Sequence, residues 1–430
     1  MKNSNTARPV GAGDALSDYC GLLFSSLARS DQRHWAEVYI RGLLITPGRK
    51  SLAAISELTL GHREIQSLQQ FVNQSTWDHA AVRASLGALA AAANRPRAWA
   101  VEETAFPKNG DHSVGVARQF AHAAGRTLNC QLALSLTLVG EDTDIPLDWR
   151  LMLPECWDGD RARRAKAHLP ERERHQPRWR HVLDLMDELI EDWHLPSAPV
   201  LLDGSAEQDI EPLLAGLEAR GLGYIVDVGP GTVVRPAAGG ALGRGLSAAQ
   251  CVHGGMYKGD RTTVSWAEGA DGATRQSQFL TVPVPGVAPA ADARGHRAPA
   301  QRVRLVLAEW PAGRSRARGY WVTNLAARTP AHIVALAKLR SRTRAAVENL
   351  HADFGLGDFE GRSFRGWHHH VTLVSAAAAF SRVSPPMPGR TPRERAAAAP
   401  PELTQLIARP DAVSPLHRET AATAPEWSLA

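Results

Sequence analysis

Residues 99–110, "WAVEETAFPKNG", decide how this chain is expected to fold. The segment "AWAVEE" begins with small and apolar residues, which predict a buried β-strand, and it ends in two adjacent carboxylates, Glu102 and Glu103. The Phe-Pro-Lys-Asn-Gly sequence that follows is typical of a turn. The stretch therefore predicts acidic groups at the end of a strand, and it raises the question of why both are glutamate rather than the shorter aspartate.

A second acid follows a similar strand further along the chain. The apolar segment "APVLLD" ends in Asp203, and an amphipathic helix is expected before it at 178–194. A helix at 207–221 and another apolar strand at 222–228 come next. Strand, helix and strand in this order predict an α/β fold with a partly parallel sheet and crossover helices.

The remaining sequence extends this core in both directions. With 430 residues, the chain is longer than one hydrophobic core usually holds. We expect helices at 13–94, a β-rich segment with a Pro/Ala loop at 283–300, and one long helix that begins at Thr329. The predicted divisions are a helical N-terminal domain at 1–95 that binds DNA, the first part of the core at 96–228, a β-rich insertion at 229–329, the last core helices at 330–383, and a disordered Pro-, Ala- and Arg-rich tail at 384–430.

Composition excludes some classes of protein and favours one class of partner. The chain has neither an apolar run long enough to span a bilayer nor an apolar signal core, so we expect a cytoplasmic protein without a membrane partner. Its four cysteines are far apart and predict reduced structural thiols. The net charge is +5, and arginine supplies much of the positive charge. Arginine suits phosphate recognition, although a coding bias toward arginine explains the composition equally well.

Carboxylates at neighbouring strand ends suggest a metal site. Oxygen ligands from Glu102 and Asp203 could jointly hold Mg²⁺, which prefers such ligands. Two ions of this kind activate water and stabilise the leaving oxygen in phosphodiester cleavage, with a third carboxylate supplied by a helix. The alternative is that Glu102 and Glu103 are solvated charges.

Several longer motifs carry a family resemblance. They are "SDQRHWAEVYIRGLL", "SLQQFVNQSTWD", "FPKNGDHSVGVARQF", "NCQLALSLTL", "IPLDWRLMLPECW", "GYWVTNL" and "FGLGDFEGRSFRGWHHHVTLV". From about residue 30 to 380, the chain resembles DDE-superfamily insertion-sequence transposases, specifically the branch named after insertion sequence 701. The resemblance implies a ribonuclease-H-like core interrupted by a β insertion, and Mg²⁺-dependent cutting and joining of DNA at transposon ends. It also implies duplex DNA as the partner and leaves a homodimer open as the assembly.

The family's catalytic positions can be carried over one at a time. Glu102 stands at the position of the first aspartate, and Asp203 matches the second. The family's helical spacing R-x3-E-x6-K falls on Arg340, Arg344 and His351, so an arginine stands where the third carboxylate is expected. The family's Ala-Gly-Tyr-Gly turn after the second aspartate is also replaced.

These departures predict an altered site. The extra methylene of Glu102 displaces its carboxylate, and Mg²⁺ requires near-ideal octahedral geometry. The fixed cation of Arg344 repels Mg²⁺, and we expect its side chain to point at Glu102 and Asp203. Glu348 is the alternative third carboxylate, because it lies one turn further along the same helix face. On that alternative, Glu102, Asp203 and Glu348 form the catalytic set.

The same resemblance assigns a set of DNA contacts and leaves two functions open. The cationic residues expected to contact phosphates are Lys108, Arg118, Arg340, Arg342, Arg344, Arg362 and Arg365. One function is a working transposase with Mg²⁺ held by Glu102 and Asp203. The other is a transposase-derived DNA-binding or regulatory protein, domesticated or decaying, that has lost catalysis and needs no metal. The several independent departures favour impaired or lost catalysis.

Overall fold

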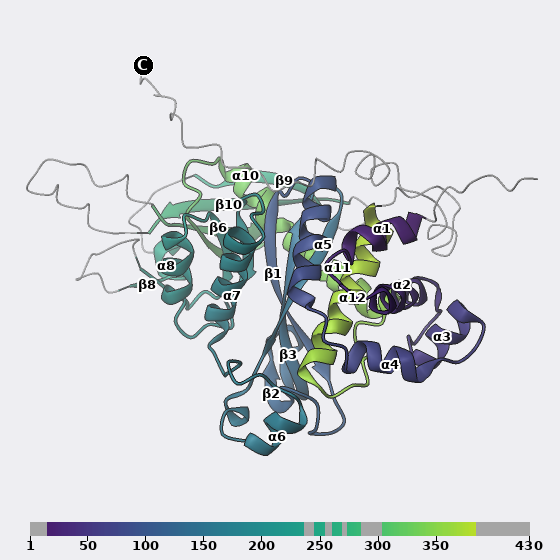
Figure 1. The fold of residues 1–430 in the computed structure, drawn as a ribbon. Helices are drawn as coiled ribbons and strands as arrows, with labels where there is room; N and C mark the ends of the chain where they lie inside the picture. Colours follow the sequence, from purple (N-terminus) through teal and green to yellow (C-terminus); the bar gives the residue numbers. More distant parts are fainter. Residues whose placement is uncertain (1–14, 236–244, 254–259, 269–272, 285–302, 384–430) are drawn as a thin grey trace, which may run out of the picture.

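The computed structural model describes residues 15–235, 245–253, 260–268, 273–284 and 303–383. Within these residues a large mixed sheet forms the centre of the molecule, and Figure 1 shows α7 and α8 on one side of β1 and α11 and α12 on the other. This is the α/β, ribonuclease-H-like arrangement that the sequence predicts. No helix in the described part of the chain is long and apolar enough to cross a membrane.

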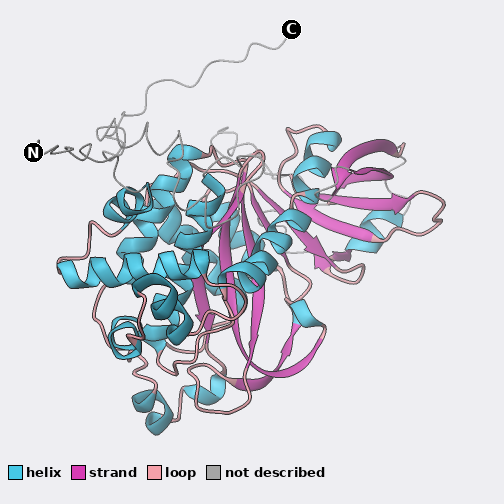
Figure 2. Cartoon of the chain, turned by 90° about the vertical axis from the view of Figure 1, so that its right-hand side faces the viewer, coloured by secondary structure: helices cyan, strands magenta, loops and turns pink. Residues whose placement is uncertain are grey.

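The N-terminal helices gather beside the sheet and pack around the C-terminal helix (Figure 2). They are α1 (Ala15–Leu23), α2 (Ser30–Ile45), α3 (Leu52–Leu60), α4 (Ile65–Asn73) and α5 (His79–Ala93). Local sequence determines where some of them begin. The side chains of Ser51 and Asp78 accept hydrogen bonds from the first backbone amides of α3 and α5, which are N-cap interactions. The predicted helical character of residues 13–94 is confirmed where the structure describes it.

The main sheet has the order β2-β3-β1-β5-β6-β12-β11-β10-β9, and β4 pairs with β3. Its strands are β1 (Ala98–Pro107), β2 (Ala117–Ala121), β3 (Arg126–Val139), β4 (Asp144–Met152), β5 (Val200–Asp203), β6 (Tyr224–Val228), β9 (Thr262–Glu268), β10 (Ala273–Pro283), β11 (Leu305–Pro311) and β12 (Gly319–Thr323). β7 (Val233–Val234) and β8 (Leu246–Ser247) form a separate pair. The described strands of the expected insertion therefore extend the core sheet.

Helices and short turns connect these strands. The later helices are α6 (Arg161–Lys166), α7 (Arg178–Asp187), α8 (Glu211–Ala219), α9 (Ala248–His253), α10 (Pro330–Lys338), α11 (Arg340–Phe354) and α12 (Phe364–Val383). Single helical turns are η1 (His122–Ala124), η2 (Glu155–Trp157) and η3 (Glu188–Asp192). The domain boundaries predicted from the sequence remain predictions.

Strand register decides which acids share a face of the sheet. β1 runs parallel to β5, and β5 runs parallel to β6. Val101 pairs with Leu202, and Asp203 pairs with Asp227, so Glu102, Asp203 and Asp227 occupy corresponding positions on three adjacent strands. Because side chains alternate along a strand, these three acids project from one face. The predicted adjacency of the Glu102 and Asp203 strands is confirmed. The prediction that Glu102 and Glu103 end their strand is wrong, because β1 continues through its pairing with β3 to Pro107.

The structure differs from the sequence-based expectation in two elements. The predicted long helix from Thr329 is two helices, α10 and α11, which meet at Leu339; the Thr329 cap is present, since its side chain accepts a hydrogen bond from the His332 amide. Strand β4 had not been predicted. Its register with β3 shifts between Leu136 and Thr137, which interrupts the period-two pattern that identifies strands. Most of the expected 283–300 loop and the tail from 384 lie outside the described residues.

Candidate active site

Arg340 forms the centre of the acidic cluster. Its Nε donates to Glu102 Oε1 at 3.0 Å and its Nη2 to Glu102 Oε2 at 2.9 Å, which is a bidentate pair. Its Nη1 donates to Asp227, and its Nη2 lies 3.5 Å from Asp203 Oδ2. Arg340 is only 4% exposed. One guanidinium therefore binds the carboxylates of three neighbouring strands.

Arg344 approaches the same acids from the side of the cluster that faces a solvent-filled cleft. Its Nη2 donates to Asp203 Oδ2 at 3.0 Å, and its Nε lies 3.5 Å from Glu102 Oε2. The predicted direction of this side chain is confirmed, although 54% of it remains exposed. The hydroxyl of Thr343, between the two arginines in sequence, lies 3.1 Å from Glu102 Oε1. The start of α11 thus supplies two cations to the cluster.

Contacts of Lys338, the last residue of α10, hold the start of α11 in place. Lys338 donates to Glu309 at 2.6 Å, and its ammonium lies 4.4 Å from the ring centre of Trp266. Cation–π and ion-pair contacts of this kind fix a flexible lysine. Arg340 follows two residues later, so these contacts anchor the helix break from which Arg340 reaches the acids.

Electrostatics keep Asp203 and Arg340 ionised. Burial raises the pKa of Asp203, but the hydrogen bonds from Ser205 and the positive charges of Arg340 and Arg344 outweigh it, and the net pKa lies below the ordinary value. Burial likewise lowers the pKa of Arg340, but Glu102 and Asp203 outweigh it and the net pKa is raised. Asp203 and Arg340 are therefore both charged at neutral pH.

A cleft of about 550 Å³ opens beside this cluster. Glu103 lies at one side of it, on the opposite face of β1 from Glu102, and accepts hydrogen bonds from the amides of His122 and Ala123 at 2.8 and 3.3 Å. The Nε of Arg178 lies 3.7 Å from Glu103, and its Nη1 donates to Glu207 at 3.1 Å. Glu103 is therefore satisfied by backbone amides and an arginine.

The other side of the cleft belongs to α11. Glu348 and His351 line it, and both are exposed. The Glu348 carboxylate accepts no hydrogen bond from any residue in the described part of the chain. The ring centres of His351 and Phe106 are 5.7 Å apart. The candidate third carboxylate thus shares the cleft with Glu102 and Asp203 but is not joined to them.

The predicted DNA contacts occupy different environments. Arg118 and Arg362 are exposed, and Arg365 is exposed with one hydrogen bond to the Gln74 carbonyl at 3.3 Å. Arg342 donates to Asp144 at 3.0 and 3.1 Å. Lys108 donates to the Phe359 carbonyl at 3.3 Å, and burial lowers its pKa. Arg340 is buried among carboxylates, a position that does not suit phosphate binding.

The histidines of the "WHHH" motif are packing residues. His369 bonds to the Val72 and Trp77 carbonyls at 2.9 and 3.0 Å, and His370 bonds to the Tyr39 hydroxyl at 3.0 Å. Burial lowers the pKa of both histidines to about 4, so they are neutral at physiological pH. Through these bonds the histidines join α12 to α2 and α4.

The residues of the cluster do not fit Mg²⁺ in this arrangement. A divalent cation would meet two guanidinium groups already bound to the same carboxylates, and like charges in a partly buried site repel strongly. Within the described ranges, no group of three or more His, Cys, Asp or Glu side chains could hold a metal ion. The donor set instead forms a network of ion pairs.

Sequence reasoning missed two members of this network. Asp227 lies in the predicted strand "LGYIVDV", and a parallel pairing with "APVLLD" puts the two acids level. The apolar pattern of the two strands can be read from the sequence, but the register in which they pair cannot. Arg340 was assigned to DNA because the sequence does not show that its helix begins against the strand ends.

Comparison with known families gives one match over the core of the chain: residues 22–284 match the family model described as DDE superfamily endonuclease. The matched segment includes Glu102, Asp203 and Asp227 and ends before Arg340. Among curated proteins, none matches the chain.

Proposed function

Because the chain belongs to the DDE superfamily endonuclease family, we propose that it is a transposase-related DNA-binding protein whose metal-dependent cleavage and strand transfer are lost or impaired. We place it in the branch named after insertion sequence 701, on the motifs given above. DNA is its partner on this proposal, and the ancestral substrate is a transposon end.

The observation that carries the loss of catalysis is Arg344, which stands at the position of the family's third carboxylate and binds Asp203 and Glu102 instead. Arg340 and Arg344 bind the carboxylates of Glu102 and Asp203, which are the two acids that match the family's first metal ligands. A guanidinium is always charged, so it is not released by deprotonation. The longer side chain of Glu102 adds a second defect, since misplacement by about 1 Å can cost on the order of a hundredfold in rate.

DNA binding is supported by cationic side chains that lie outside the acidic cluster. The net charge is +5, and Arg118, Arg362 and Arg365 are exposed. Such side chains neutralise phosphates and release counterions, which makes affinity fall steeply with salt. Arg340 is left out of this set because its donors serve Glu102 and Asp227.

An active enzyme is the second candidate, and one observation favours it. Glu348 lines the cleft with a carboxylate that no described side chain binds, so it is available as a third acid. This candidate requires Arg344 to leave Asp203, and more than half of the Arg344 side chain is already exposed. The two functions therefore differ in what Arg344 does when DNA and metal are present.

A plasmid-nicking assay with Mg²⁺ or Mn²⁺ separates the two. We expect no nicking by the unmodified protein and little by Arg344→Glu alone, because Glu102 is still too long. The double change Glu102→Asp with Arg344→Glu is expected to gain metal-dependent nicking, and adding Asp203→Asn to it should abolish that gain. Nicking by the unmodified protein that Glu348→Gln removes would overturn the proposal in favour of the active enzyme.

A further inference from the structure

The loop between β11 and β12 carries an unusual group of arginines. Arg314, Arg316 and Arg318 alternate in it, and all three are exposed. None of them forms an ion pair with any described residue, whereas many exposed arginines elsewhere do, such as Arg63 with Glu57 and Arg180 with Asp184. Three guanidinium groups so close in sequence hold positive charge that no described carboxylate neutralises.

A polar groove of about 520 Å³ adjoins this loop. Thr263, Gln276 and Gln278 line it from the strands β9 and β10, and Arg314 lines it from the loop. Trp310 forms part of its wall. The groove therefore offers amide and hydroxyl groups beside the unpaired arginines.

A fourth arginine is fixed next to the same groove. The guanidinium carbon of Arg261 lies 3.9 Å from the ring centre of Trp310, which is a cation–π contact. The acid beside it in the chain is Asp260, which forms no ion pair with a described residue. The four arginines thus far exceed the acidic charge of Asp260.

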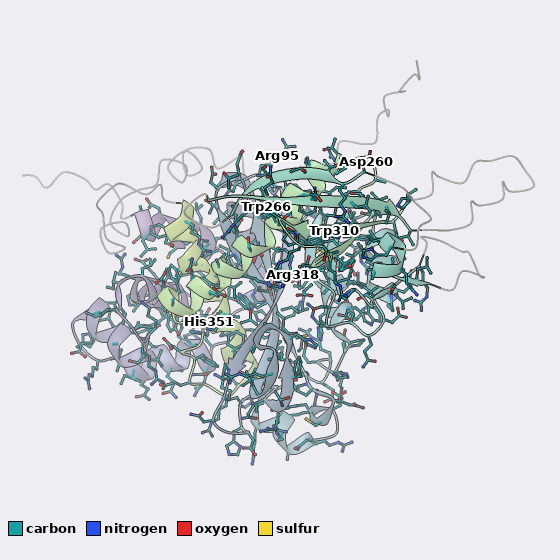
Figure 3. The ribbon with its side chains drawn as sticks, turned by 180° about the vertical axis from the view of Figure 1, so that it is seen from behind. Arg95, Asp260, Trp266, Trp310, Arg318 and His351 are labelled. Atoms are coloured by element: carbon teal, nitrogen blue, oxygen red, sulfur yellow. The ribbon has the colours of Figure 1, made fainter. Side chains whose placement is uncertain are left out.

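The position of this surface relates it to the cleft. Seen from behind, the labelled Arg318 lies, in projection, between Trp310 of the outer strands and His351 of the cleft (Figure 3). The start of β12 lies beside the end of β6, since Trp321 pairs with Asp227, so the loop before β12 lies at the same edge of the sheet as Asp227.

We propose that Arg261, Arg314, Arg316 and Arg318, together with the adjoining groove, form a second DNA-contact surface that binds the phosphodiester backbone. The inference rests on the proposed function for the identity of the partner. Arginine forks donate paired hydrogen bonds to phosphate oxygens, and the glutamine amides can bond to the sugar and backbone. This "arginine-loop surface" is separate from the cations assigned around the acidic cluster.

The chemistry of the surface favours DNA over an acidic protein. Protein interfaces are built around buried aromatic and apolar anchors, whereas DNA interfaces are polar and strongly positive. Trp310 is only 2% exposed, and none of the large exposed hydrophobic side chains of the described residues lines the groove. The surface therefore lacks an apolar anchor for a protein partner.

The test compares two full-length variants that lose the same charge. The loop variant is Arg314→Gln, Arg316→Gln and Arg318→Gln. The matched control is Arg161→Gln, Lys166→Gln and Arg172→Gln, which alters exposed cations on and after α6, at the end of the molecule away from β9 and β10 (Figure 1). Fluorescence anisotropy with a labelled random-sequence DNA duplex gives the affinity of each protein at several salt concentrations.

The loop variant should lower the slope of log affinity against log salt by about 3, or about 1 for each phosphate that an arginine no longer neutralises. The control should change it by less than about 1, and the matching triple Arg→Lys loop variant should retain most of the slope. Equal slopes for the loop variant and the unmodified protein would overturn this inference while leaving the proposed function intact. No DNA binding by the unmodified protein at any salt concentration would overturn both.

Discussion

Arg304 and Arg340 are both buried arginines that bind several acids, yet their surroundings differ. Arg304 donates to Glu218 at 2.8 and 3.0 Å and to Glu211 at 2.8 and 2.9 Å, and its side chain is 1% exposed. Arg340 shares its donors among three carboxylates, and a second arginine, Arg344, completes the cluster from an open cleft.

The difference shows what marks a site. Both arginines use the same forked hydrogen bonding, so neither burial nor pairing distinguishes them. Arg304 immediately precedes β11 and binds two glutamates of α8. It does not line the cleft beside the Arg340 cluster. Both groups have one more acid than arginine, but only the Arg340 cluster borders the cleft. The cleft therefore distinguishes the candidate site from an ion-pair group that only joins α8 to the sheet.

The largest expected effect on stability is at Arg304 and the two glutamates that it binds. Arg304→Ala leaves Glu211 and Glu218 without their cation, so we expect a loss of about 3–5 kcal/mol in the free energy of unfolding. Urea unfolding measures it. Arg316→Ala, at an exposed unpaired arginine, is the control and should change stability by no more than about 0.5 kcal/mol. A small loss at Arg304 would remove the contrast between the two regions.

A smaller loss is expected at the cleft. Arg340→Ala should cost about 1–3 kcal/mol, because water from the cleft can hydrate the carboxylates that lose their hydrogen bonds. The double variant Arg340→Ala with Arg344→Ala should also gain stabilisation by Mn²⁺ that the unmodified protein lacks, by about 2.7 kcal/mol at a hundred times the dissociation constant. Thermal unfolding with and without Mn²⁺ measures both effects. If Mn²⁺ stabilises the Arg304→Ala protein equally, the cleft has no special affinity for cations.

Acid pH is expected to lower the stability of the protein through a third region, the buried histidines of α12. Burial lowers the pKa of His370 from 6.5 to about 4. The unfolded chain therefore binds a proton before the folded one does, and stability is complete above pH 6.5 and falls between pH 6.5 and about 4. We expect His370→Gln to remove about 1 kcal/mol of the stability loss between about pH 7 and about pH 5.5. Urea unfolding of both proteins at the two pH values tests this, and an unchanged pH dependence would contradict it.

The smallest expected effect is at Glu348. Because its carboxylate has no hydrogen-bond donor among the described residues, Glu348→Gln should change the free energy of unfolding by less than about 0.5 kcal/mol. It should leave DNA affinity unchanged or slightly higher, since it removes a negative charge from the cleft. A marked loss of stability would show that Glu348 belongs to the ion-pair cluster after all.

The sequence alone determined the order of the core elements and two acids of the site. Apolar strands that carry Glu102 and Asp203, with a helix between strands, are local patterns, because the chain's own alternation and capping produce them. The direction of Arg344 also followed from sequence, through the spacing of a family motif. That spacing identifies the residue at a position but says nothing of what else occupies the site.

Only the tertiary structure decided which charges meet. Asp227 joins the cluster because β6 pairs with β5 in one register, and a shift of one residue would turn its side chain to the other face. Arg340 became the central cation, rather than a DNA-binding residue, because the helix breaks at Leu339 and starts again against the strand ends. The arginine-loop surface likewise depends on how β9 to β12 fold beside one another. Pairings between residues more than a hundred positions apart have no local sequence pattern, since register and packing alone bring them together.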